Sequence, residues 1–170
     1  ELLQVVIPKG RNIWAFADDD SEKLNEVGRS FEFFVLPENN EANVKKAMKD
    51  GNFFAASKYY KTTDGVGDFD GDGNVPLVTD IKVDQKANTI TVATDPTRDC
   101  QVIEWIADGK VIATGNTIDL NDYEKDLGCY IRFQMKGSGG VTYSQPFELQ
   151  YKGRIDKPVP SWALWVFKTE

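Results

Sequence analysis

The stretch VIEWIADGKVIATGNTIDLNDYEKDLGCYIRF, from Val102 to Phe133, decides the fold. Its first part is rich in strand-forming residues around Trp105, and the pair Asp108-Gly109 that follows is typical of a tight hairpin turn. Residues 110–113 then return as a second strand. Because strands joined by so short a turn run antiparallel, this stretch predicts an antiparallel sheet.

Further along, Asp126-x-Gly128-x-Tyr130 resembles the pattern that opens strand F of immunoglobulin-like domains. In those domains a tyrosine at the corner before strand F hydrogen-bonds back to the preceding backbone. The resemblance implies an immunoglobulin-like antiparallel β-sandwich over residues 77–151, with an unrelated antiparallel sandwich as the alternative.

Alternating and apolar runs predict the strands of this sandwich and its core. The expected strands are 78–84, 88–94, 101–107, 110–113, 117–120, 129–135 and 142–150, with a hairpin at Gly137–Gly140. The expected core residues are Trp105, Ile106, Ile112, Ile118, Leu120, Tyr130 and Phe133.

Composition narrows the class of protein. The chain has 170 residues, which is enough for two compact units, and a net charge of −7 with scattered Lys and Arg. A nucleic-acid groove and an anionic membrane surface are therefore disfavoured, and no apolar run is long enough for a membrane span. Histidine is absent, which removes the commonest general base and metal ligand. Cys100 and Cys129 fall near opposite ends of neighbouring strands, so we expect two free thiols.

The N-terminal third has a different, α/β character, so the expected fold class is α+β and mainly β. Ile13–Ala17 is almost wholly apolar, as expected of a buried parallel strand. Asn39 or Asn40 can cap a helix over residues 41–50, and Gly51 can end it. The other expected elements are the end of a helix at Glu1–Pro8 and strands at Ser30–Leu36 and Phe53–Ser57.

Three segments of this region, GRNIWAFADDDSE, VGRSFEFFVL and NEANVKKAMKDGNFFAAS, resemble in order and spacing the C-terminal end of a bacterial PHP-domain metal-dependent phosphoesterase. The resemblance covers Glu1 to about Tyr60. It implies that residues 1–60 are the α/β remnant of a PHP-type barrel, whose upstream part is missing from this chain. It further implies that the parent enzyme acts on a phosphate ester and holds divalent metal, namely Mn, Mg, Fe or Zn.

The metal-site pattern of the family is only partly kept. Its closing Asp-x-His falls on Asp20-Ser21-Glu22, so Asp20 keeps a carboxylate and Glu22 stands in place of the histidine. A carboxylate is a harder ligand than imidazole and favours Mg or Mn over Zn. With at most two ligands, this chain alone is expected to be inactive. The alternative is that Asp18–Glu22 is a solvated turn with a helix cap.

A second metal candidate is the acidic stretch Asp68-Phe-Asp70-Gly-Asp72-Gly-Asn74, which matches the start of a calcium loop. The later positions fall on Pro76 and Thr79, and no glutamate closes the loop. The alternative is that residues 61–76 are an acidic, Gly-rich flexible linker.

The last segment, residues 152–170, is an aromatic arm with Trp162, Trp165 and Phe167. We expect Ser161–Phe167 to dock over the N-terminal unit, with sugar binding by the tryptophans as the alternative.

Three functions fit this pattern: the C-terminal part of a metal-dependent phosphoesterase, a non-catalytic binding or adhesion module of immunoglobulin-like type, and a structural brace. The sequence does not indicate whether the protein is cytoplasmic or exported.

Overall fold

The computed structural model describes residues 13–61 and 68–149 of the chain. The strands are β1 (Ser30–Phe34), β2 (Phe53–Ser57), β3 (Tyr59–Lys61), β4 (Asp68–Asp70), β5 (Val78–Asp84), β6 (Thr89–Thr94), β7 (Val102–Ala107), β8 (Lys110–Thr114), β9 (Thr117–Asp119), β10 (Tyr130–Gly137), β11 (Gly140–Tyr143) and β12 (Phe147–Glu148). The helical elements are α2 (Glu41–Asp50) and the 3-10 turns η2 (Leu24–Glu26) and η3 (Leu120–Tyr123).

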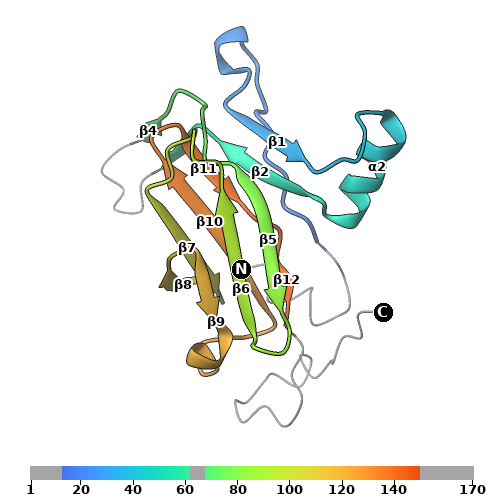
Figure 1. Ribbon diagram of the computed structural model, residues 1–170. Coiled ribbons are helices and arrows are strands. Elements are labelled where there is room, and N and C mark those ends of the chain that lie inside the picture. Colours follow the sequence, from blue (N-terminus) through green and yellow to red (C-terminus); the bar gives the residue numbers. More distant parts are fainter. Residues whose placement is uncertain (1–12, 62–67, 150–170) are drawn as a thin grey trace, which may run out of the picture.

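The described chain is mainly β and its sheets are antiparallel. The larger sheet has seven strands in the order β1-β2-β11-β10-β7-β8, with β12 pairing with β10 beside that path. The smaller sheet has the order β5-β6-β9, and β3 and β4 form a separate ribbon. Figure 1 shows β1, β2 and α2 extending to one side of the packed sheets. A mainly β, antiparallel fold is therefore confirmed.

One apolar core lies between the two sheets. Trp105 is fully buried in it, meets Phe133 edge-on with ring centroids 5.4 Å apart, and donates its Nε1–H to the Gly115 carbonyl at 2.9 Å. The small sheet contributes Ile90 and Ile118 from the opposite side. The predicted burial of Trp105, Ile106, Ile118 and Phe133 is confirmed, while Ile112 and Leu120 are half-buried against the core.

Tyr130 is buried, as predicted, but not in this core. Phe133 pairs with Trp105 across β10 and β7, and Ile131 and Phe133 both point into the sandwich. Because successive side chains alternate between the two faces of a strand, Tyr130 points to the opposite face. There it packs with Ile13 and Cys129. The predicted burial of Tyr130 is therefore confirmed, on the other face of the sheet from Trp105, and the corner hydrogen bond stays a prediction.

Local turn and cap signals were predicted correctly. Asp108 and Gly109 both have positive φ, 50° and 76°, as a type I′ hairpin turn requires. The Asn40 side chain accepts a hydrogen bond from the Asn43 amide at the start of α2. Gly51 ends the helix in the left-handed conformation, with φ 75°.

The expected parallel arrangement of the N-terminal strands is wrong. β1 runs antiparallel to β2, with Phe31 opposite Ala56, and β2 runs antiparallel to β11, with Ala56 opposite Thr142. Residues 30–57 therefore extend the large sheet of the sandwich. Ile13–Ala17 is not a strand, and Phe16 within it is 43% exposed. This apolar run lies against one face of the sheet and does not form part of it.

The acidic stretch before β5 is packed against the β10–β11 hairpin. The Gly71 amide donates to the Lys58 carbonyl at 2.7 Å, and the Gly73 amide donates to the Gly139 carbonyl at 3.1 Å. A Cβ on Gly139 would lie well within 3.0 Å of the Asn74 carbonyl, so only glycine allows this approach. These contacts favour a packed stretch over residues 68–76, and the flexible linker at residues 61–76 stays a prediction.

Both cysteines are free, as predicted. The predicted helix end at Glu1–Pro8 and the aromatic arm at 152–170 lie outside the described residues.

Candidate functional site

The acidic loop 18–29 is positioned by the segment that precedes it. The Gln145 side chain bonds both backbone groups of Ala15: Nε2 donates to the carbonyl at 2.9 Å, and the Ala15 amide donates to Oε1 at 2.8 Å. The Ala17 amide donates to Glu32 Oε1 at 2.7 Å. Phe16 packs on Phe53 with ring centroids 4.5 Å apart. The side chains of Gln145 and Glu32 thus bind the backbone groups that a neighbouring strand would otherwise pair with, and these bonds fix the position at which the loop begins.

Asp19 closes the neck of the loop. Its carboxylate accepts hydrogen bonds from the Gly28 and Ser30 amides, both at 2.5 Å. These amides, with the Ser30 bond as the larger effect and the charge of Arg29 as a smaller one, hold the pKa of Asp19 below its ordinary value. Asp19 is therefore a structural residue whose ionised form is stabilised by the backbone amides of the loop neck.

The two residues predicted as metal ligands lie beyond this neck. Asp20 and Glu22 are both exposed, and Asp20 has a left-handed backbone with φ 47°. The Glu22 amide donates to Glu26 Oε2 at 3.1 Å, so the backbone of the loop is fixed from within by η2. Leu24 in the same turn is 91% exposed. The loop presents both predicted ligands, and the exposed apolar side chains of Leu24 and Val27, away from the sheet.

These two carboxylates do not make a metal centre by themselves. Within residues 13–61 and 68–149, no group of three or more His, Cys, Asp or Glu side chains is arranged to hold a metal ion. A centre of the PHP kind needs several ligands to bind its metals and a phosphate ester. The described residues do not fit such a centre alone, so hydrolysis would depend on ligands supplied by the rest of a parent protein.

The acidic stretch 68–74 has a different geometry from a calcium loop. Asp68 and Asp70 lie in β4, opposite Lys61 and Tyr59 of β3. Asp70 lies 4.0 Å from the Lys58 ammonium, and Asp72 accepts a hydrogen bond from the Asn74 amide at 2.8 Å. The hydrogen bond between Asp72 and Asn74 closes a local turn within the stretch. Calcium binding at Asp68, Asp70, Asp72 and Asn74 stays a prediction.

Comparisons with protein-family models, with curated proteins and with solved structures found no match. Within the described parts of the chain, none of the helices has the length and apolar character needed to cross a membrane. Function therefore has to be argued from the residues themselves.

Three residues that position the site were not predicted from the sequence: Asp19, Glu32 and Gln145. Asp19 is one of three consecutive aspartates, and no pattern distinguishes it from its neighbours. Gln145 bonds a backbone 130 residues earlier in the chain, and such a partner has no local signal.

Proposed function

We propose that this chain is the C-terminal, accessory part of a PHP-type metal-dependent phosphoesterase, joined to an immunoglobulin-like sandwich. In this proposal Asp20 and Glu22 are two ligands of a divalent metal centre, and the remaining ligands come from a part of the parent protein that precedes Glu1. The three matching segments of residues 1–60 support it through their order and spacing.

One structural observation carries the proposal. Both carboxylate oxygens of Asp19 accept hydrogen bonds from backbone amides at the neck of the loop. Asp20 and Glu22 are exposed on the loop, whose backbone these bonds hold in place. Carboxylates that are already positioned bind a metal at a smaller entropy cost than carboxylates on a free chain. The same loop also exposes two apolar side chains, Leu24 and Val27.

The antiparallel pairing gives this proposal a specific architecture. Because β1 and β2 belong to the large sheet of the sandwich, residues 30–57 and the sandwich form one unit. The sandwich then holds the metal-binding loop at a fixed distance from its own core. Its role is structural support of the centre, and it supplies no group to the chemistry.

The test uses the parent protein and a metal-dependent assay of phosphodiester hydrolysis. Asp20→Asn removes one charged ligand and is expected to abolish hydrolysis. Asp18→Asn changes an exposed aspartate two residues away and is the matched control, with unchanged activity. Full activity in the Asp20→Asn parent protein would contradict the proposal and favour a non-catalytic binding or adhesion module.

A further inference from the structure

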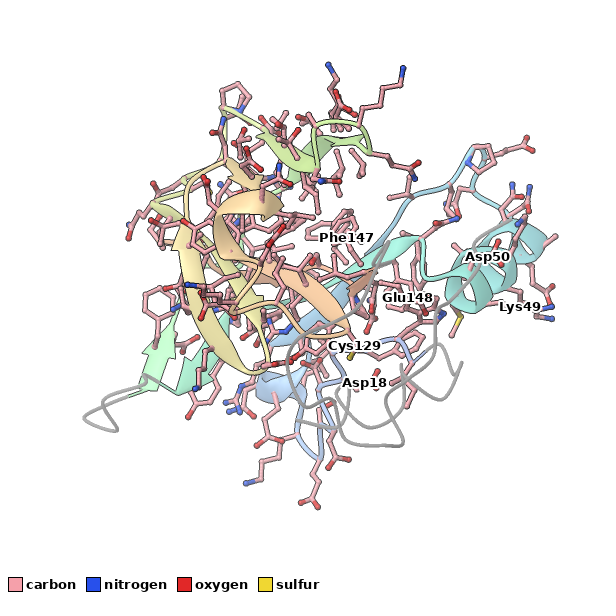
Figure 2. All side chains as sticks on the ribbon, turned by 90° about the horizontal axis from the view of Figure 1, so that it is seen from below. Asp18, Lys49, Asp50, Cys129, Phe147 and Glu148 are labelled. Atoms are coloured by element: carbon pink, nitrogen blue, oxygen red, sulfur yellow. The ribbon has the colours of Figure 1, made fainter. Side chains whose placement is uncertain are left out.

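An apolar groove opens between the β1–β2–α2 extension and the edge strand β5. It has a volume of about 320 Å³. Its lining is mainly apolar and includes Trp14, Val35, Phe53, Phe54, Ile81, Pro146 and Phe147, and its polar lining residues are Asp50, Asn52, Ser144 and Gln145. Figure 2 shows Phe147 of β12 and Asp50 of α2, which both border the groove.

The groove is preformed. The Trp14 ring lies so close to Gly51 that any Cβ there would overlap it, and Trp14 Nε1 donates to the Lys49 carbonyl at 3.0 Å. Both contacts fix the indole at the end of α2. Val35, on the other side, is 60% exposed. A preformed apolar surface of this kind favours an apolar occupant, because the contact removes apolar area from water.

We propose that the groove is the docking site of the C-terminal segment Ser161–Phe167 of the same chain, anchored by Trp162 and Trp165. The sequence of this segment, SWALWVF, supplies two indoles and a phenyl ring within seven residues. Aromatic side chains are the usual anchors in such grooves, because they bury a large area with few rotatable bonds.

The position of the chain end supports this occupant over a separate molecule. The described part of the chain ends at Leu149, two residues after Phe147, which lines the groove. The stretch from Leu149 to Ser161 can span up to about 40 Å, so it reaches every part of the groove. A tether of this length keeps the segment at an effective concentration on the order of millimolar, so modest contacts suffice. The inference does not depend on Asp20 or on the proposed function.

The experiment is hydroxyl-radical footprinting of the full chain, in which mass spectrometry reads the oxidation rate of each tryptophan separately. If the segment occupies the groove, Trp162 and Trp165 should oxidise severalfold faster in a Val35→Asp variant than in the wild type. Val111→Asp is the matched control, because Val111 is a similarly exposed valine, at 51%, on β8 and outside the groove. Trp105 reports on the fold in the same sample, since it stays protected only while the core is intact.

A reciprocal variant keeps the test decisive if Val35→Asp disturbs folding. Trp162 and Trp165 lie outside the described residues, so replacing both by alanine removes none of the contacts described above and should make Trp14 oxidise severalfold faster. Equal Trp14 rates with and without the two tryptophans would overturn the proposal. So would protection of Trp162 and Trp165 that Val35→Asp leaves unchanged while Trp105 stays protected. Protection that is lost on dilution would place the segment of a second copy in the groove and would also overturn docking within one chain.

Discussion

Replacing Gly139 by alanine tests whether the stretch 68–76 is built into the fold. The new Cβ would lie well within 3.0 Å of the Asn74 carbonyl and of the Val75 amide nitrogen, which are backbone atoms that cannot rotate away. Val75 itself is fully buried, so the stretch cannot move outwards without uncovering it. Overpacking of this kind costs about 2–3 kcal/mol.

The sign of the change separates the two interpretations of residues 61–76. Gly139 does not have a positive φ, so alanine fits its backbone conformation without strain. If the stretch were a free linker, the substitution would stabilise the protein by about 0.4–1 kcal/mol, because it restricts the unfolded chain. The packed stretch predicts destabilisation, and a flexible linker predicts the opposite.

Urea denaturation followed by tryptophan fluorescence measures the difference. With a slope of about 2 kcal/mol per molar urea, the midpoint should fall by about 1–1.5 M. Lys125→Ala, at an exposed position away from this turn, is the control and should change the free energy of unfolding by no more than about 0.5 kcal/mol. A Gly139→Ala midpoint at or above the wild-type value would refute the packing described for residues 68–76.

Three further predictions follow from individual contacts. Gln145→Ala removes both hydrogen bonds to the Ala15 backbone, which should speed hydrogen exchange at the Ala15 amide by about tenfold, as the loss of about 1.4 kcal/mol implies. The pKa of Asp19 is lowered from its ordinary value of 3.8, so its carboxylate stays ionised and keeps its hydrogen bonds to the loop neck at every pH above 3.8. The stabilisation is lost as the pH falls through the lower pKa of the folded state, and NMR of the Gly28 amide against pH should show this loss. Burial, and then the nearby charges of Asp108 and Glu148, raise the pKa of Cys129 to about 11, so its alkylation at pH 8 should be roughly two orders of magnitude slower in the folded protein than in urea.

Each of these has a control and a contrary outcome. Gln101 is an exposed glutamine, and Gln101→Ala is the control that should leave hydrogen exchange at the Ala15 amide unchanged. Equal exchange rates at Ala15 in the Gln145→Ala and wild-type proteins would show that the two hydrogen bonds from Gln145 do not hold residues 13–17 in place. Asp19→Asn should remove the pH dependence of the Gly28 signal, whereas Asp18→Asn should keep it. Alkylation of Cys129 at the same rate in folded and unfolded protein would be inconsistent with its burial.

Much of the secondary structure was predictable from local patterns. α2 was predicted with its observed bounds, because Asn40 and Gly51 mark its ends by mechanisms that act within one turn. The Asp108-Gly109 hairpin was predicted for the same reason, since both residues adopt the positive φ that the turn requires. Such signals need no knowledge of the rest of the fold.

Partners distant in sequence were not predictable. The runs at 30–34 and 53–57 indicate strands, but nothing in them states that β2 pairs with β11. Tyr130 shows a related limit, because its burial was predicted from the sequence but the face of the sheet on which it lies was not. Ile13–Ala17 is as apolar as a buried strand and was predicted to be one. In the structure its backbone amides instead donate to the side chains of Gln145 and Glu32, and no local pattern indicates these partners.

The central claim is that Asp20 belongs to a divalent metal centre of a larger enzyme. Elemental analysis of the parent protein, purified without added metal, tests it most directly in the wild type and in Asp20→Asn. The proposal predicts stoichiometric Mn, Fe, Zn or Mg in the wild type and a clear loss in Asp20→Asn, with Asp18→Asn unchanged. A wild-type protein without these metals, or with the same metal content after Asp20→Asn, would contradict the claim.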